Sequence, residues 1–477
     1  MKTLIRPWPI MPALGLLAFV VLLLAPAAAT AATAPQPSKS NLSMGSLVQL
    51  QGPRGCLVDR SQVRGRCGSA RAIMGPGPFV GSRAIALSPN GRNLYVASSG
   101  SNAIAIFKRN RSTGFLTQSG GKAGCVAVKA AEGCGLAFGL RGPNSIAISP
   151  DGRSLYATSR DSGSITSFAR NPRTGALKQI PKAGCISGPA IPGCTPGRAL
   201  SGPDVVTISP DGDNVYVGSF FGNAIAVFNR KTSGTLTQPT DETGCITEVA
   251  TSGCAQGLAL DSPEGMAVSG DGENVYVATA VSNAVLSFSR DTDSGALTQA
   301  IGGTGCIVDA ALSGCTTGNQ IDGANAVAVS PGDDDVYVTS LISTSLTSFS
   351  RSSDSGSLLQ LPGKSGCVLW LGGSGCSPGR ALRAPEGLAI SPDGANVYVT
   401  AYSSGAIAVM NRNLATGTVF QKAGSGGCLT IQSIAKCAPG HKLAGASSVT
   451  VSPNGRNVYV TAYDGNAVDV FRRVTLP

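Results

Sequence analysis

Residues 144–180 read NSIAISPDGRSLYATSRDSGSITSFARNPRTGALKQI. Apolar and polar residues alternate in SIAIS, SLYATS and SITSFAR, while the connecting segments SPDG and NPRTG are rich in Gly, Pro and Asp. Alternation with a period of two predicts β-strands, and short turns containing Gly join antiparallel neighbours. With ALKQI as a fourth strand, this stretch predicts a four-stranded antiparallel meander.

The same pattern occurs seven times along the chain. Each copy carries a serine at the end of its first strand, and successive serines are 60 or 61 residues apart: Ser88, Ser149, Ser209, Ser269, Ser330, Ser391 and Ser452. A repeat of this length indicates a propeller or a solenoid, and helical periodicity is missing after the N-terminal apolar run. The sequence therefore predicts an all-β, seven-bladed β-propeller with four-stranded antiparallel blades.

The two ends of the chain complement each other. The last copy stops after its third strand, residues 466–473, and a fourth-strand motif stands at the other end, where Gly45–Gln49 (GSLVQ) matches Gly295–Gln299 (GALTQ). We expect the N-terminal strand to complete the last blade, because closure leaves no unpaired edge at the seam.

Large apolar residues recur at fixed points of the repeat. Every second strand has a tyrosine and every third strand a phenylalanine or methionine: Tyr95, Tyr156, Tyr216, Tyr276, Tyr337, Tyr398 and Tyr459; Phe107, Phe168, Phe228, Phe288, Phe349, Met410 and Phe471. Sheets that stack face to face need such side chains to fill the space between them. We interpret both sets as core rather than as a ligand-stacking surface.

The N-terminus has the three parts of a secretory signal peptide. Lys2 and Arg6 precede an apolar run from Leu14 to Leu24, and small residues follow, with a plausible cleavage site at residues 29–31. An uncleaved anchor is disfavoured because the run is shorter than the ~20 residues of a membrane span. The expected organisation is a signal peptide (1–31), a short linker (32–44) and the propeller (45–477) of a secreted, extracellular protein with no membrane span in the mature chain.

The fourteen cysteines fall into seven close pairs. An even number of thiols in an exported chain predicts disulfides, whereas zinc sites need shorter spacings and further ligands, and this chain has one histidine. The predicted bridges are Cys56–Cys67, Cys125–Cys134, Cys185–Cys194, Cys245–Cys254, Cys306–Cys315, Cys367–Cys376 and Cys428–Cys437.

The chain is basic, with a formal charge of +11 that becomes +9 when Lys2 and Arg6 are removed. The cations are spread over turns without interleaved aromatic residues, which argues against nucleic-acid binding. One concentration surrounds the first cysteine pair: Arg54, Arg60, Arg64, Arg66 and Arg71. It suits either an anionic cell-envelope polymer or a solvated loop on a monomeric protein.

A candidate site emerges where each first strand begins. The long connection to that strand contains the cysteine pair, so we expect seven stapled loops to form a crown around the mouth of the central channel. The residue five before each marker serine would converge there: Arg83, Asn144, Asp204, Glu264, Asn325, Glu386 and Ser447. This oxygen-rich set suits Ca²⁺, a sugar or a lactone, or it solvates a water-filled mouth.

Several strings resemble a known family. Ser149–Gly152 (SPDG), Asn214–Val217 (NVYV) and Asn396–Thr400 (NVYVT) resemble the YVTN-type propeller repeat, and the seven copies over residues 45–477 resemble the bacterial lactonase-like propellers. The resemblance implies either lactone chemistry, as in 6-phosphogluconolactonases and the cycloisomerase of carboxymuconate metabolism, or a surface protein without known chemistry.

Two functional hypotheses follow. One is an extracellular binding or surface protein whose channel-mouth face contacts a small molecule, a glycan or a cell-envelope component. The other is a lactone hydrolase or isomerase, in which Glu264 or Glu386 acts as general base, Arg83 stabilises the oxyanion and Asp204 assists. Several family members use a histidine, but the only one here, His441, lies in the last cysteine loop, so no catalytic residue is carried over.

Overall fold

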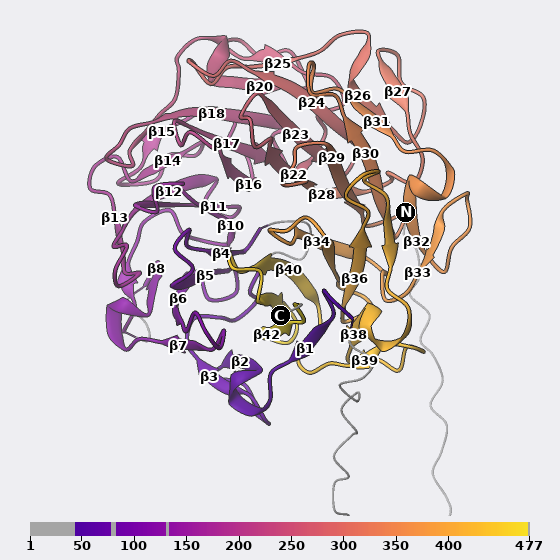
Figure 1. Cartoon of the computed structure of the whole chain (residues 1–477). Helices are drawn as coiled ribbons and strands as arrows, with labels where there is room; N and C mark the ends of the chain where they lie inside the picture. Colours follow the sequence, from indigo (N-terminus) through magenta and orange to yellow (C-terminus); the bar gives the residue numbers. More distant parts are fainter. Residues whose placement is uncertain (1–42, 78–82, 130–132, 476–477) are drawn as a thin grey trace, which may run out of the picture. The chain divides into compact units, whose positions relative to one another are not determined.

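Seven six-stranded sheets form a ring in the computed structural model, which describes residues 43–77, 83–129 and 133–475 (Figure 1). The predicted seven-bladed all-β propeller is confirmed. The predicted signal peptide and most of the linker lie outside the described residues. Within the part that is described, no helix is long and apolar enough to cross a membrane.

Each blade keeps the predicted meander of four strands. The first strand of each blade lies nearest the centre in Figure 1: β4 (Ile85–Leu87), β10 (Pro143–Ile148), β16 (Pro203–Ile208), β22 (Pro263–Val268), β28 (Ala324–Val329), β34 (Pro385–Ile390) and β40 (Ala446–Val451). We call these the inner strands and number the blades 1 to 7 in this order.

The second and third strands follow as hairpins. The second strands are β5 (Asn93–Ser98), β11 (Ser154–Ser159), β17 (Asn214–Ser219), β23 (Asn274–Thr279), β29 (Asp335–Ser340), β35 (Asn396–Ala401) and β41 (Asn457–Ala462). The third strands are β6 (Ala103–Arg109), β12 (Ser164–Arg170), β18 (Ala224–Arg230), β24 (Ala284–Arg290), β30 (Ser345–Arg351), β36 (Ala406–Arg412) and β42 (Ala467–Arg473).

The outer edge of each blade is more elaborate than expected. The fourth strand covers only one half of the third: in blade 2, β13 (Leu177–Gln179) pairs with residues 168–170 of β12, while β14 (Cys185–Ser187) pairs with residues 164–166. A short strand, β15 (Thr195–Pro196), then runs parallel to β14. Each blade thus gains two short strands beyond the meander.

The other blades repeat this edge. The fourth strands are β7 (Leu116–Gln118), β19 (Leu236–Thr237), β25 (Leu297–Gln299), β31 (Leu358–Gln360), β37 (Val419–Gln421) and β1 (Leu47–Gln49). The cysteine strands are β8 (Cys125–Ala127), β20 (Cys245–Thr247), β26 (Gly303–Val308), β32 (Cys367–Trp370), β38 (Cys428–Thr430) and β2 (Cys56–Asp59). The outermost strands are β9 (Gly135–Leu136), β21 (Ala255–Gln256), β27 (Cys315–Thr317), β33 (Ser377–Gly379), β39 (Ala438–Pro439) and β3 (Gly68–Ala70).

All seven predicted disulfides are formed, and none of the fourteen cysteines is free. Their position corrects the sequence analysis. Because the cysteine strand pairs with the third strand, each bridge lies at the outer edge of its blade, farthest from the inner strand. The bridges therefore do not form a crown around the channel. They fasten the outer edge of each sheet and indicate an oxidising setting.

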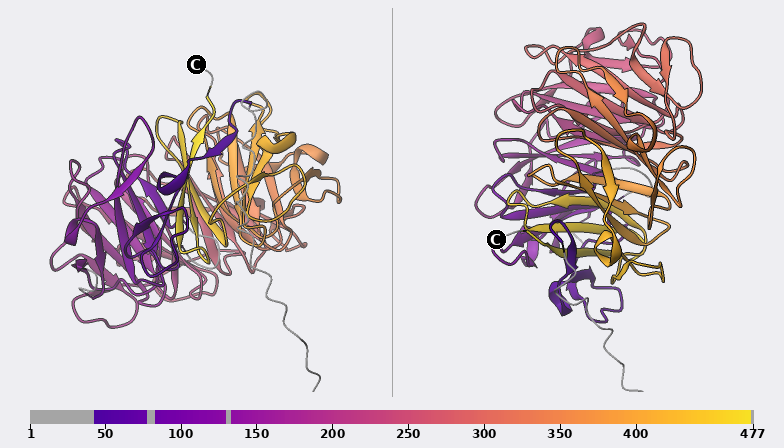
Figure 2. Two further views of the ribbon diagram at one scale, coloured as in Figure 1. Left: turned by 90° about the horizontal axis from the view of Figure 1, so that it is seen from below. Right: turned by 45° about the vertical axis from the view of Figure 1, so that its right-hand side comes forward.

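The N-terminal segment completes blade 7, as predicted. In β1, Leu47 pairs with Arg473 and Gln49 with Phe471 of β42, and β2 continues along the other half of that strand, with Cys56 opposite Asp469. Figure 2 shows these indigo strands beside the yellow C-terminal ones. The first and last described segments of the propeller are thus joined by a backbone ladder.

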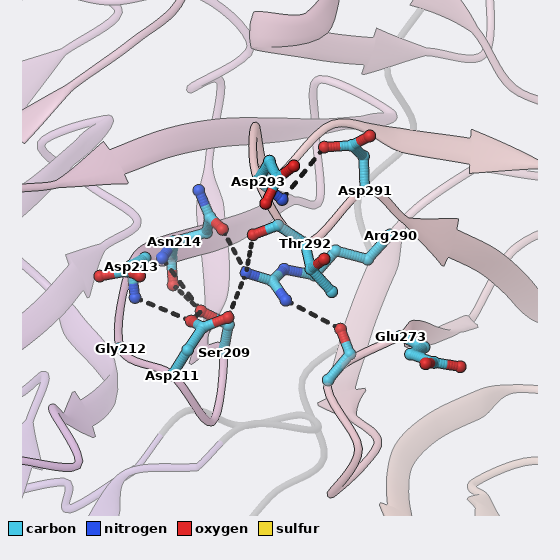
Figure 3. A network of polar contacts seen from close by, with 12 residues as sticks. Ser209, Asp211, Gly212, Asp213, Asn214, Glu273, Arg290, Asp291, Thr292 and Asp293 are labelled. Atoms are coloured by element: carbon cyan, nitrogen blue, oxygen red, sulfur yellow. Dashed lines mark hydrogen bonds and ion pairs between the residues drawn. The ribbon is translucent and has the colours of Figure 1, made fainter.

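An arginine clasp connects each blade to the one before it. The arginine that ends each third strand donates from Nε to the buried tyrosine of the preceding blade at 2.6 to 2.9 Å, and this tyrosine donates to a glycine carbonyl back in the arginine's blade at 2.5 to 2.9 Å. Figure 3 shows Arg290 also contacting Asp211 and Asn214 of blade 3. The tyrosines are core residues, as expected, with a polar link between blades in addition.

The glycine in this clasp is required by geometry. Gly295 has a φ of +76°, and a Cβ atom there would lie 2.1 Å from Nδ2 of Asn214 in the neighbouring blade. A side chain at this position would be strained and would also push the blades apart. The turn between third and fourth strands therefore sets the spacing between blades.

The clasp predicts the effect of losing one hydroxyl. Tyr216→Phe leaves Nε of Arg290 without its acceptor and the carbonyl of Gly295 without its donor, so we expect a loss of about 2 kcal/mol in unfolding free energy. Thermal and urea unfolding measure it. Tyr463→Phe, at a half-buried site where no hydrogen bond of the hydroxyl is seen among the described residues, is the matched control. Equal stability of both variants would contradict the role of the clasp.

The disulfides predict the thiol content. The denatured, unreduced protein should show no reactive thiol, because every cysteine is bridged. Removing one bridge with Cys185→Ser and Cys194→Ser should lower the unfolding free energy by about 2–3 kcal/mol, since the bridge closes a short loop of the unfolded chain. Titration with a thiol reagent before and after reduction, together with thermal unfolding, tests both. Two free thiols per molecule would show that one bridge is missing.

Candidate functional site

The predicted ring residues lie at the start of the inner strands, and most of them occupy β-bulges. The pairing of each inner strand with its second strand shifts register around Asn144, Asp204, Glu264, Asn325 and Glu386. A bulge leaves one residue out of the ladder and redirects its side chain. The structure buries all five, and also Ser447, to 2% exposure or less. Their burial places them inside the ring rather than at an open mouth, and we call this the closed end of the channel.

Asp204 is held by cationic and amide groups from blade 2. Arg160 donates to its Oδ1 from Nη2 at 2.7 Å and from Nε at 3.2 Å, and the amide of Asn144 also donates to this oxygen. Arg160 in turn lies 5.0 Å from the ring centre of Phe220. Burial raises the pKa of Asp204 to about 6 even though Arg160 opposes the shift.

Glu264 and Glu386 are less well satisfied. Oε2 of each carboxyl is buried and has no hydrogen-bond partner among the described residues, and the same holds for Oδ2 of Asp204. Burial raises the pKa of both glutamates well above the usual value, and the neighbouring carboxyls add to it: Asp204 acts on Glu264, and Glu264 acts on Glu386. The three acids therefore form one interacting set at the inner end of the channel.

Arg83 crosses the channel beside these acids. It precedes β4 in blade 1, and its Nη2 donates to the carbonyl of Val327 in blade 5 at 3.0 Å. Arg83 is exposed to the space within the channel. The inner strands around it still exclude part of the surrounding water, and this desolvation lowers the pKa of the guanidinium. Arg83 is the sequence-predicted cation that lines the same small space as two of the predicted acids, Glu264 and Glu386.

Two neighbouring spaces share Arg83 as a wall. The smaller, of about 20 Å³, is lined by Arg83, Glu264 and Glu386 together with the backbone around them. The larger, of about 530 Å³, is lined by the later residues of the inner strands, mostly apolar, with Thr207, Ser209 and Thr450 as polar groups. Leu388 and Val449 also line both spaces. A small chamber thus adjoins a cavity of the size that binds small ligands.

The larger cavity corrects the expected location of the opening. Its lining extends to Pro150, Pro210 and Pro331, which lie in the tight turns between first and second strands. It therefore reaches the face made by these turns, opposite the end where the long connections enter the inner strands. The carboxylates stand at the closed end and the cavity at the other.

The Ca²⁺ that the sequence suggested stays a prediction. No group of three or more His, Cys, Asp or Glu side chains is arranged to hold a metal ion anywhere in the described ranges. Asp204 is already bound to Arg160 and Asn144, and the amide of Asn325 donates to the carbonyl of Pro385 at 2.9 Å. Ca²⁺ takes six to eight oxygen ligands, and among these groups Oδ2 of Asp204 and Oε2 of Glu264 and Glu386 have no hydrogen-bond partner in the described part of the chain.

His441 lies away from the channel. Its backbone pairs with the side chain of Gln49 at the outer edge, donating to Oε1 at 2.8 Å and accepting from Nε2 at 3.0 Å, while the imidazole is exposed. Glutamines of the other fourth strands hold the preceding blade in the same way, as Gln299 holds Leu258. The position is structural, and a surface histidine occupies it.

Sequence reasoning missed Arg160, the partner of Asp204. It stands in the turn between second and third strands, where the corresponding residues of neighbouring blades are Ser99 and Phe220. No spacing pattern singles it out. Its role is visible only because the ring geometry brings this turn over the adjacent inner strand.

Fold and site together define a seven-bladed β-propeller whose channel ends on buried carboxylates. The sequence model of the family "Lactonase, 7-bladed beta-propeller" matches residues 80–194 and 187–304. The chain is therefore similar to lactonase-like propellers. No curated protein gives a significant match.

Solved structures share the fold at low identity. A proposed 6-phosphogluconolactonase from Bacteroides uniformis is 20% identical over 78% of this chain and 88% of that chain, with a TM-score of 0.53. Another from Bacteroides fragilis is 18% identical over 74% and 84%, with a TM-score of 0.51. Hydrazine synthase from Kuenenia stuttgartiensis is 18% identical over 84% and 96%, also with a TM-score of 0.51. At this identity the likeness establishes the fold alone.

The buried acids predict a pH-dependent cost to stability. Because the folded-state pKa of Glu264 and Glu386 is raised, stability falls as pH rises from about 4.5 through that pKa and stays reduced above it. Glu264→Gln and Glu386→Gln should raise the melting temperature at pH 8 by about 1–3 °C and change it little at pH 4. The exposed Glu273→Gln is the control. A melting-temperature difference that is independent of pH would refute this account.

Proposed function

We propose that this protein hydrolyses a lactone at the inner end of its channel, in an oxidising compartment outside the cytoplasm. One observation carries the proposal: Glu264, Glu386 and Arg83 line a chamber of about 20 Å³ that adjoins a cavity of about 530 Å³. The similarity to the lactonase family and the seven disulfides support it. Secretion by an N-terminal signal peptide is part of the proposal.

The chamber has the size of one water molecule, which needs roughly 10–15 Å³ and two to four polar partners. The unpartnered carboxyl oxygens of Glu264 and Glu386 are such partners. A lactone in the larger cavity would present its carbonyl carbon to this water across the boundary that Arg83, Leu388 and Val449 share. The substrate binds in the cavity, and the nucleophile is held behind it.

The paired glutamates supply the proton transfers. Their mutual repulsion favours a state in which one carboxyl is protonated and the other ionised. The ionised group takes a proton from water as the water oxygen bonds to the carbonyl carbon. The ring carbon–oxygen bond then breaks, and the ring oxygen receives a proton from a carboxyl. This second transfer returns the glutamate pair to its starting protonation. The products are a hydroxyl and a carboxylic acid, and the new acid then loses its proton to solvent.

Arg83 stabilises the charge that develops during attack. The guanidinium is fixed across the channel by its bond to the carbonyl of Val327. A fixed cation beside the carbonyl oxygen lowers the energy of the tetrahedral intermediate more than that of the neutral ring. Arg160, paired with Asp204, limits the negative charge near Glu264, and Asp204 acts as a positioning residue.

A binding function without turnover is the second candidate. The raised pKa of Glu264 and Glu386 favours protonated carboxyls, which donate hydrogen bonds to carbonyl or sugar oxygens instead of accepting protons. In that case the same cavity would hold a small molecule, a glycan fragment or a cell-envelope component unchanged, with Asn144 and Asn325 helping to shape its closed end.

Steady-state kinetics on a panel of five- and six-membered lactones tests the proposal. Glu386→Gln and Glu264→Gln should each lower kcat/KM by about 100-fold or more without loss of melting temperature. The activity of the wild type should rise with pH along a limb that lies well above pH 4.5, because the base has a raised pKa. Glu242→Gln, at an exposed site away from the cavity and the turns around it, should keep full activity. If calorimetry shows that a lactone binds and the kinetic assay shows no turnover of it, the binding candidate is favoured and the proposed hydrolysis is overturned.

A further inference from the structure

The turns on the cavity-bearing face divide it into seven sectors. The turn between first and second strands of one blade lies against the turn between third and fourth strands of the next blade: Asn90 donates to the carbonyl of Pro172 and Asn454 to that of Arg111, both at 3.2 Å. Each sector thus combines two turns from neighbouring blades. We call the face made by these turns the turn face.

Charge on the turn face is separated by sector. Three consecutive sectors, which join blades 7 and 1, 1 and 2, and 2 and 3, carry exposed cations: Arg456 and Arg111, Arg92 and Arg173, and Arg153 and Lys231. The next three, which join blades 3 and 4, 4 and 5, and 5 and 6, carry exposed anions: Asp213 with Asp291 and Asp293, Glu273 with Asp354, and Asp334. Figure 3 shows Asp213, Glu273, Asp291 and Asp293 near the clasp of Arg290.

The seventh sector, between blades 6 and 7, has no such unpaired charge among its described residues, which include 43–45, 392–395 and 474–475. Ala395 stands where the other blades have charged residues, and the partly exposed Met44 lies next to the closing strand. The nearby Asp393 is bound to Arg473 at 2.7 Å. None of the twelve charged residues named above forms an ion pair in the described ranges. Their charges are therefore free to attract an external partner.

This pattern is complementary to itself. A line from the neutral sector to the boundary between Lys231 and Asp213 divides the face into a basic and an acidic half. Rotation by 180° about that line brings the basic half of one molecule over the acidic half of another, sector by sector. The neutral sector lies on the axis and meets its own copy without repulsion. Two-fold interfaces require this kind of self-complementarity.

We propose that two copies of this protein associate through their turn faces about this two-fold axis. The sectors of Arg153 and Asp213 then face each other beside the axis, those of Arg92 and Glu273 farther out, and those of Arg456 and Asp334 next to the neutral sector. Every contact occurs twice. The charge separation favours a second copy over a nucleic acid or an anionic membrane, because either would be repelled by the acidic half.

The association has a consequence for the channel. The cavity of about 530 Å³ reaches the turn face, so the paired faces would place two cavities mouth to mouth. Ligand access would then depend on dissociation of the pair. The pairing rests on the surface charges alone and is independent of the proposed hydrolysis.

Sedimentation velocity at two ionic strengths tests the proposal. The wild type should form dimers at about 50 mM salt and dissociate at about 500 mM, because exposed charge pairs are screened. Two triple variants sharpen the test: one carries Arg92→Glu, Arg153→Glu and Arg173→Glu, and the other Asp213→Lys, Glu273→Lys and Asp354→Lys. Each should be monomeric alone at low salt, and an equimolar mixture should form a one-to-one dimer.

A third variant controls for net charge. Arg64→Glu, Arg66→Glu and Lys122→Glu reverse three exposed cations at the outer edges of blades 7 and 1 and should leave the dimer intact. A wild type that is monomeric at low salt overturns the proposal. So does a dimer that survives either turn-face variant, or a mixture that fails to associate.

Discussion

The hydrogen-bonded link from an arginine to the tyrosine of the preceding blade is the interaction on which the ring depends. It occurs between all seven pairs of neighbouring blades, including the pair at the closure, where Arg473 donates to Tyr398 and Tyr398 donates to Gly45. Burial raises the pKa of the tyrosines, for example Tyr216, so their hydroxyls stay protonated and available as donors. The guanidinium has several hydrogen-bond partners, and loss of one of them would leave a buried donor unsatisfied.

This constraint explains why the inner end of the channel tolerates unfavourable groups. A ring closed by seven clasps and a terminal strand cannot relax by opening one seam, so side chains at the inner bulges are held where the ring places them. Oε2 of Glu264 and Oε2 of Glu386 have no hydrogen-bond partner among the described residues, although either carboxyl would be solvated in a more open fold. The energetic cost of the carboxylates is offset by the packing and the clasps between blades. Buried groups with such unfavourable energies are typical of sites selected for chemistry or binding.

The large-scale architecture could be predicted from the sequence because each structural feature of a blade is repeated seven times. The spacing of Ser88 through Ser452 set the number of blades, the GSLVQ motif identified the closing strand, and the paired cysteines specified all seven bridges. The place of the bridges was not predictable in the same way. Whether Cys185 lies near the channel or at the edge depends on β14 pairing with the first half of β12, a non-local choice that strand patterns do not encode.

The sequence was sufficient to predict which residues form the candidate site, but not how they are arranged. Counting five residues back from each serine found Asp204, Glu264 and Glu386, because the repeat fixes their register. The register shift at each of these residues then turned them toward a closed interior, and the long side chain of Arg83 reached blade 5 from blade 1. Bulge geometry and contacts across the channel arise from the closed ring and have no local sequence signature.

Comparison among the seven copies separates structural from functional positions. Residues that are alike in every blade, such as the clasp tyrosine and arginine, serve the ring and account for its closure. Two kinds of position differ from blade to blade: the inner bulge, which carries amide, carboxylate or hydroxyl, and the exposed turn, which carries cation, anion or neither. Both lie along the channel axis, one at its closed end and one around its open end. Positions that are alike in all seven blades cannot distinguish one blade from another, so we propose that these two positions determine binding and association.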